Sequence, residues 1–135
     1  MQVKLFNTAY IHPHWDVIGG FIEDALMMSD CDDYTAEQVK VLLISNKWSL
    51  FVAEEDNKIK GCAVVAFGNN PNSRTAFITA IGGKFIGNKD TLANFSELLK
   101  SMGATKIQGY ARESVARLWK RIGFENKQIL VEYKL

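Results

Sequence analysis

TAFITAIGGKFIGNKDTLANFSELLKSMG, residues 75–103, passes from an apolar strand pattern through a loop with glycines into a helix pattern. β-Branched and aromatic side chains dominate residues 75–81, which predicts a strand. Apolar residues then recur at spacings of three and four, which predicts a helix capped by Asp90 or Thr91 and ended by Gly103. A strand, a glycine-bearing loop and a helix start in this order indicate an anion site, because free backbone N–H groups and the helix dipole point the same way.

The loop itself carries Lys84, Gly87 and Lys89 just before the predicted helix. The two lysines would add positive charge without fixed geometry. A plain connecting loop with solvated lysines is the alternative interpretation, because short glycine patterns of this kind are weak signals.

Outward from this segment, the chain alternates strands and helices without an internal repeat. A capping-box pair, Thr35 and Gln38, marks one helix start, and Gly123 marks one helix end. The antiparallel middle and the late crossover helices favour one α+β domain over residues 1–135, with three layers (α/β/α) and a mixed sheet. The other predicted elements are strands at 2–7, 49–53, 59–67, 105–111 and 128–135, and helices at 14–28, 35–47 and 113–122.

Composition and charge exclude several classes of protein. The net charge of +1 gives no chain-wide basic footprint, so we expect no nucleic-acid partner. No apolar run approaches the ~20 residues of a membrane span, and the start lacks a signal-peptide pattern, so we expect a cytoplasmic protein without a membrane partner. His12 and His14 lack further ligands nearby, so we expect no metal. Cys62 is interpreted as a core residue, and Cys31 as a loop thiol.

Three stretches resemble segments of one family. FVAEEDNKIKGCAVV (51–65) resembles its second and third strands, and ARESVARLWKRIGF (111–124) resembles its late Asn-x-x-Ala-x-x-Leu-Tyr-x-x-x-Gly-Phe segment. Residues 84–89 match only the central glycine of its pyrophosphate loop. Over nearly its whole length the chain is therefore similar to the GNAT superfamily of acyl-CoA-dependent N-acetyltransferases, and to its short members from bacteriophages.

This resemblance implies a fold and a co-substrate. The fold would be that of the acyl-CoA N-acyltransferases, with a mixed, mostly antiparallel sheet of six to seven strands and helices on both faces. The co-substrate would be acetyl-CoA, which requires no metal. By position in the family motifs, the residues that would bind it are Ile81, Gly83, Lys84, Phe85, Ile86, Gly87, Asn88, Lys89 and Arg112.

The resemblance also implies direct attack of an amine on the thioester. Trp119 stands where the family has a proton-donating tyrosine, and indole cannot serve as that acid, so Tyr110 is the substitute candidate. Glu54 is a candidate base, as are Glu23 and Asp24. The acceptor would lie near Asp32, Asp33 and Tyr34, whose carboxylates favour a cationic amine; a solvated acidic loop is the alternative.

Two functions remain open at this stage. One is an N-acetyltransferase that acts on a small-molecule or protein amine. The other is a non-catalytic binding or assembly protein of the same fold, favoured by Lys84, Lys89, Arg112 and Trp119 at diagnostic positions. The exposed sheet edges of such a fold also permit a homodimer.

Overall fold

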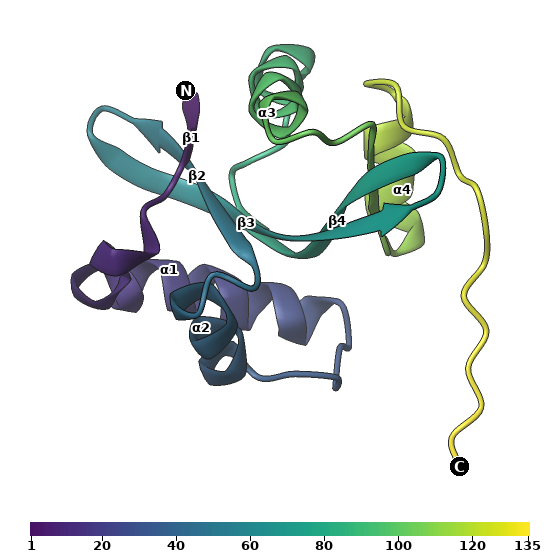
Figure 1. The fold of residues 1–135 in the computed structure, drawn as a ribbon, viewed down its shortest axis with the longest axis horizontal. Coiled ribbons are helices and arrows are strands. Elements are labelled where there is room, and N and C mark those ends of the chain that lie inside the picture. Colours follow the sequence, from purple (N-terminus) through teal and green to yellow (C-terminus); the bar gives the residue numbers. More distant parts are fainter.

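The computed structural model describes residues 1–135 and contains one mixed sheet between helices (Figure 1). The five strands lie in the order β1-β2-β3-β4-β5, and every neighbouring pair is antiparallel except β4 and β5, which are parallel. The elements are β1 (Gln2–Leu5), a 3₁₀ turn (Thr8–Tyr10), α1 (Ile11–Met28), α2 (Ala36–Ile44), β2 (Ser49–Glu55), β3 (Lys58–Asn70), β4 (Ser73–Gly83), α3 (Lys89–Ser101), β5 (Lys106–Gly109) and α4 (Glu113–Lys120).

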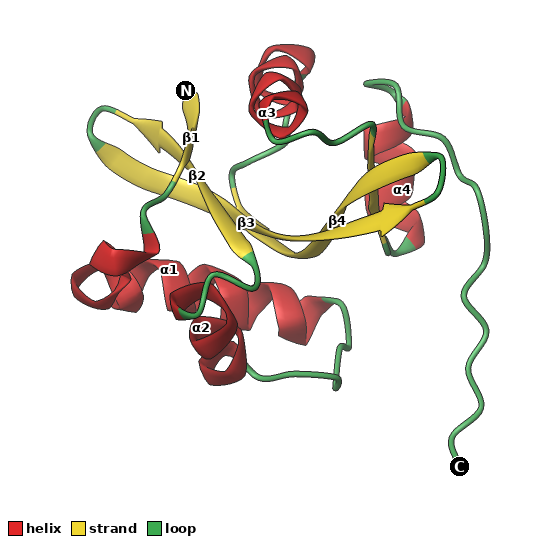
Figure 2. Ribbon diagram, viewed as in Figure 1, coloured by secondary structure: helices red, strands yellow, loops and turns green.

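Each face of the sheet has its own hydrophobic core. On one face, Ile18 of α1 and Leu43 of α2 are buried with Val64 of β3. On the other face, Phe95 of α3 packs edge-on against Phe51 of β2, with 5.2 Å between the ring centroids, and α4 contributes to the same cluster. Helices therefore cover both faces, as predicted (Figure 2).

The helix ends follow from their capping residues. Thr35 and Gln38 form the predicted capping box at the start of α2, with both hydrogen bonds present. At α3 the prediction of Asp90 or Thr91 as the cap was wrong. Asn88 has the extended backbone of a cap, and its Oδ1 accepts the Thr91 N–H at 2.9 Å. An earlier cap places Asp90 inside the first turn of the helix.

The strand count differs from the prediction of six to seven, because residues 128–135 do not form a strand. This segment leaves the body of the molecule as an extended tail without a ladder partner (Figure 2). An alternating apolar pattern creates a strand only where a neighbouring strand can accept its backbone hydrogen bonds. In the single chain no such neighbour is present for the tail.

α1 crosses β4 at very short range, and a glycine makes this approach possible. A Cβ atom on Gly82 would overlap the carbonyl oxygen of Phe21 in α1 and would lie 2.9 Å from its carbonyl carbon. The next residue, Gly83, ends β4 with φ +68°, a conformation that favours glycine. These two positions fix how the end of β4 sits against α1 and where the following loop begins.

Gly82→Val should therefore destabilise the fold by about 3 kcal/mol or more, because the backbone of α1 must move to admit the side chain. Urea denaturation measures this free energy of unfolding. The control is Gly20→Val in α1, since a Cβ at Gly20 meets no atom within 4 Å. Equal effects of the two substitutions would contradict the close approach.

Candidate functional site

β4 continues beyond the point where β5 ends. β5 pairs with β4 only from Thr75 to Ile78, whereas β4 runs on to Gly83. After Gly109 the chain leaves the sheet through Tyr110 and enters α4. The last part of β4 thus has one edge paired with β3 and one edge free of any strand.

A β-bulge lies where this open edge begins. Val64 of β3 pairs with Ala80, and Val65 pairs with Ile78, so that Thr79 is an extra residue in β4. A bulge shifts the alternation of a strand by one residue and re-aims the groups beyond it. Sequence analysis missed this feature. Its signal is a slip in the apolar alternation between Ile78 and Ile81.

The bulge determines which amide of β4 faces the open edge. Before the bulge, the Arg74 carbonyl accepts the Thr105 N–H at 2.8 Å, so even-numbered residues face β5. Beyond the bulge, the Lys84 N–H donates to the Lys60 carbonyl of β3 at 2.9 Å, so even-numbered residues face β3. The shifted alternation therefore directs the N–H and carbonyl of Ile81 to the open edge.

The loop after β4 is held from beneath by two buried side chains. Phe85 and Ile86 are 2% and 7% exposed and belong to the core under α3. Only their backbone atoms are therefore available to a ligand. The predicted binding role of these two residues is limited to backbone contacts. Gly87 is exposed, and a Cβ atom there would meet nothing within 4 Å. The loop thus opens to solvent at Gly87.

The free amides of this loop continue into α3. The Gly87 N–H has no protein acceptor, and Lys89 and Asp90 are the first two residues of the helix, where N–H groups lack an intrahelical partner. Thr91 is different, since its N–H already donates to Asn88. The lysines at positions 84 and 89 are exposed beside these amides. This arrangement can bind an anion through backbone N–H groups, the helix dipole and positive charge.

Two tyrosines contact β4 near the point where its open edge begins. Tyr34, from the loop between α1 and α2, donates its hydroxyl to the Thr79 carbonyl at 2.8 Å. Burial, followed by the effect of Cys31, raises the pKa of Tyr34 well above its usual range, so it stays neutral and acts as a tether. Tyr110 packs edge-on against Phe77, with 5.1 Å between ring centroids, and is 70% exposed.

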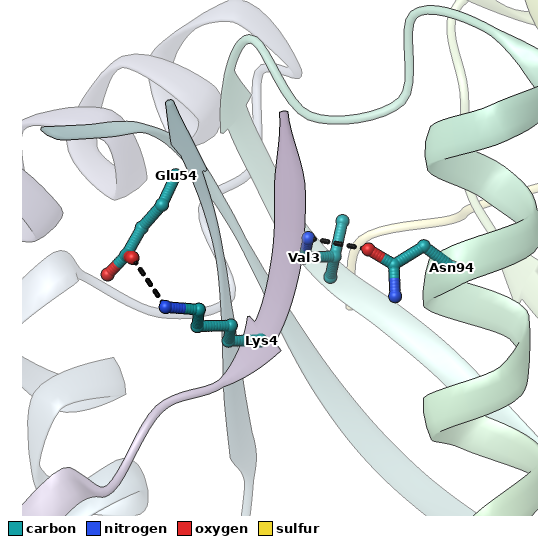
Figure 3. Close-up of polar contacts among 4 residues, drawn as sticks. All are labelled: Val3, Lys4, Glu54 and Asn94. Carbon is teal, nitrogen blue, oxygen red and sulfur yellow. Dashed lines mark hydrogen bonds and ion pairs between the residues drawn. The ribbon is translucent and has the colours of Figure 1, made fainter. Parts of the chain in front are cut away.

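The structure does not bring Glu54 to this edge. Its carboxylate pairs with Lys4 Nζ of β1 at 2.9 Å, and the neighbouring Val3 N–H of β1 donates to Asn94 Oδ1 of α3 (Figure 3). β2, which carries Glu54, is separated from β4 by β3. As a base, Glu54 would have to act from a distance and break its ion pair.

The other predicted residues lie at two places. Arg112 precedes α4, is exposed, and makes no side-chain capping bond, so its guanidinium is free of the helix start. Glu23 and Tyr34 line a surface cavity of about 480 Å³ between α1 and α2. Asp32 pairs with Lys134 of the tail at 3.2 Å, and Asp33 is exposed. The acidic loop therefore lies at the mouth of this cavity, with one carboxylate already paired.

The two histidines and Cys62 contact other parts of the fold and do not gather into a ligand cluster. No three side chains of His, Cys, Asp or Glu converge as metal ligands would. His14 packs edge-on against Phe6, and His12 Nδ1 lies 3.4 Å from Lys40 Nζ. Cys62 is buried in the core, which confirms its interpretation as a core residue, and this burial raises the pKa of its thiol to about 12. No helix has both the length and the apolar character needed to span a bilayer.

Comparison with known proteins gives matches among solved structures only. No family model matches the chain, and no curated protein sequence matches it. A probable acetyltransferase aligns with TM-score 0.71 and 13% identity over 100% of this chain and 97% of its own. An aminoglycoside acetyltransferase from an uncultured soil metagenomic sample, in complex with sisomicin, aligns with TM-score 0.72 and 16% identity over 99% and 95%. A predicted acetyltransferase from Clostridium acetobutylicum with acetyl-CoA aligns with TM-score 0.63 and 18% identity over 98% and 95%.

These alignments span nearly the full length of both chains, with TM-scores well above chance similarity. The chain therefore shares the fold of these acetyltransferases. The alignment with the probable acetyltransferase covers 100% of this chain, so it includes β4, β5 and the loop before α3. At identities below 20% this likeness concerns the fold, and the chemistry must be argued from the site.

Proposed function

We propose that this protein binds acetyl-CoA along the open edge of β4 and transfers its acetyl group to an amine. The observation that carries the proposal is a series of backbone N–H groups without a partner strand, from Ile81 on the open edge of β4 to the first turn of α3, interrupted only at Lys84, whose N–H donates to β3. An acyl-CoA is a long ligand with an amide-bearing arm and an anionic end, so it needs both an open strand edge and an anion site.

The anionic end fits the loop and the first turn of α3. The N–H groups of Gly87, Lys89 and Asp90 would bind the pyrophosphate, and Lys84 would add charge. Arg112 lies across the gap and supplies a guanidinium that suits a further phosphate. The amide-bearing arm would then extend toward the bulge, pairing with β4 as an added strand does.

At the bulge, the Ile81 N–H would stabilise the oxygen of the reacting carbonyl. A fixed backbone donor aimed at developing negative charge acts without reorganising, and one such donor contributes about 10² to 10³ in rate. The rest of the rate enhancement would come from holding the amine and the thioester in attack geometry.

The reaction also requires a base for the amine and an acid for the thiolate, and one residue is a candidate for each. Glu23, which lines the cavity with Tyr34, is better placed than Glu54 to take a proton from the amine through water. Tyr110 is exposed and close to the end of β5, so it can donate to the departing thiolate. Trp119 is buried at 7% exposure and is excluded from that role. A thiolate whose conjugate thiol has a pKa of ~8.5 also leaves without an acid.

The acceptor would be a small-molecule or protein amine that approaches from the cavity between α1 and α2. Glu23 and Glu37 line this cavity, and a positively charged amine would be attracted to their carboxylates. The cavity continues toward Thr35 at the start of α2.

A non-catalytic role in binding or assembly is the second candidate. It is favoured by the ion pair that occupies Glu54 and by the buried Trp119 at the position where the family has its proton-donating tyrosine. A protein of this kind would bind the coenzyme without turning it over, or would have lost both coenzyme binding and catalysis.

Acetyl-CoA at one hundred times its dissociation constant should stabilise the protein by about 2.7 kcal/mol. For a domain of this size that corresponds to a rise in melting temperature of roughly 5 to 11 °C. Differential scanning fluorimetry measures the shift, with ADP as a control that lacks the acyl arm. No shift at millimolar acetyl-CoA would refute the coenzyme site, whereas a shift without thiol release on addition of primary amines would favour the non-catalytic role.

A further inference from the structure

The cavity between α1 and α2 carries an acidic residue from each helix and an apolar lining. Glu23 of α1 and Glu37 of α2 line it, and neither forms an ion pair within the chain. The apolar lining comes mainly from Leu26, Met27 and Ala36. Its volume of about 480 Å³ is within the usual range for small-molecule sites. The cavity therefore has room for a small organic cation and not only for a single ammonium group.

Trp15 holds the carboxylate of Glu37 in place. The indole Nε1–H donates to Glu37 Oε1 at 3.2 Å. The indole lies against α1 at Gly19, where a Cβ atom would come within 2.7 Å of Cε2 of the ring, so the absence of a side chain makes room for it. Lys40 Nζ lies over the same ring, 5.0 Å from its centroid, and forms no ion pair with Glu37. Glu37 thus has a fixed orientation and an uncompensated negative charge.

The two carboxylates belong to neighbouring turns along the α1 axis. The indole nitrogen that binds Glu37 would lie 3.0 Å from a Cβ atom on Gly19, so the Glu37 carboxylate is close to this turn of α1. Glu23 follows four residues later on the same side of the helix, about 6 Å along the axis at 1.5 Å per residue. A ligand with one ammonium group would leave the second carboxylate without a counter-charge. A ligand with two ammonium groups on a short alkyl chain matches both carboxylates and the apolar lining.

We propose that the acceptor is an aliphatic diamine or polyamine, and that Glu37 binds the ammonium group that does not react. This inference rests on the proposed acetyl transfer. Tyr34 lines the cavity and donates to the Thr79 carbonyl, where the open edge of β4 begins, so the reacting amine would meet the thioester on this side. The reacting ammonium group first loses a proton to Glu23 through water. The neutral nitrogen then bonds to the acetyl carbon, the carbon–sulfur bond breaks, and the proton that the nitrogen releases passes to the departing thiolate.

The first test compares two acceptors in steady-state acetyl-transfer kinetics. Putrescine has two amines, and butylamine has an alkyl chain of the same length with one amine. The kcat/KM for putrescine should be about fivefold higher, which is the size of effect expected for one partly exposed ion pair. This difference exceeds the statistical advantage of a second reactive amine.

The second test removes the charge of Glu37 and then its hydrogen-bond donor. Glu37→Gln keeps the shape of the side chain and should raise KM for putrescine about fivefold, with a much smaller effect on butylamine. Trp15→Phe keeps an aromatic ring over Gly19 but lacks the N–H, so it should raise KM for putrescine while kcat changes little. Asp16→Asn is the matched control, because this residue of α1 does not line the cavity, and KM for putrescine should not change. Circular dichroism verifies that each variant is folded.

Equal kcat/KM values for putrescine and butylamine would overturn the proposal while acetyl transfer itself stood. An equal rise in KM for both amines in Glu37→Gln would overturn it in the same way. If acetyl-CoA fails to stabilise the protein, the proposed acetyl transfer fails, and isothermal titration calorimetry of the protein with putrescine alone tests the cation site. Binding that weakens in Glu37→Gln but not in Asp16→Asn would support the site, and absence of binding would overturn it.

Discussion

Gly87→Asp is expected to weaken acetyl-CoA binding at least tenfold while leaving the free energy of unfolding nearly unchanged. The new Cβ would enter open space, so the fold has no clash to relieve. The carboxylate would stand beside the amides proposed to hold the pyrophosphate. Like charges ~5 Å apart repel by about 3 kcal/mol at an effective dielectric constant of about 20, before screening by salt. Isothermal titration calorimetry with acetyl-CoA measures the change in dissociation constant.

Gly87→Asn is the matched control, because asparagine has nearly the same shape as aspartate without its charge. It should bind acetyl-CoA within a few-fold of the wild-type protein. An equal loss in both variants would mean that the side chain blocks the ligand by size. Unchanged binding in Gly87→Asp would place the pyrophosphate away from this loop and remove the basis of the proposed coenzyme site.

The order of the elements was predictable because each depends on local signals. The Thr35 capping box and the helix end before Gly123 each depend on residues close together in the sequence, and both are present in the structure. The tail shows the limit of such signals. Val131 has the alternation of a strand residue, but whether it pairs depends on a partner edge that no local pattern reveals.

For the candidate site, too, the local features were predictable and the long-range contacts were not. The loop around Gly87 was found from its glycine and lysines, since an anion site at a helix start is a local feature. The ion pair of Glu54 with Lys4 was not predictable, because it forms only where β1 lies beside β2. The bulge at Thr79 likewise depends on the register between β3 and β4. Long-range pairing decides which of several carboxylates and amides face the open edge.

Ile81→Pro tests the amide that this register presents. Proline lacks an N–H, so the variant removes the proposed donor to the carbonyl oxygen of the thioester. The Ile81 N–H faces the open edge and not β3, so the ladder with β3 loses no hydrogen bond and the strand should persist. We expect kcat for acetyl transfer to fall by about 10² to 10³, with the dissociation constant for acetyl-CoA changed only a few-fold.

Ile81→Ala separates this loss from the loss of packing, because Ile81 also contacts the core under α3. Alanine removes the same apolar contacts and keeps the N–H, so most of the activity should remain. If the two variants lose activity equally, the side chain and not the amide is responsible, and no oxyanion is stabilised at this position. If Ile81→Pro unfolds while Ile81→Ala does not, the Ile81 amide is hydrogen-bonded within the sheet. The shift of the strand alternation by one residue, inferred from the bulge at Thr79, would then be wrong. A selective fall in kcat for the proline variant alone would tie catalysis to a backbone group, which explains how a chain with so few suitably placed side chains could still transfer an acetyl group.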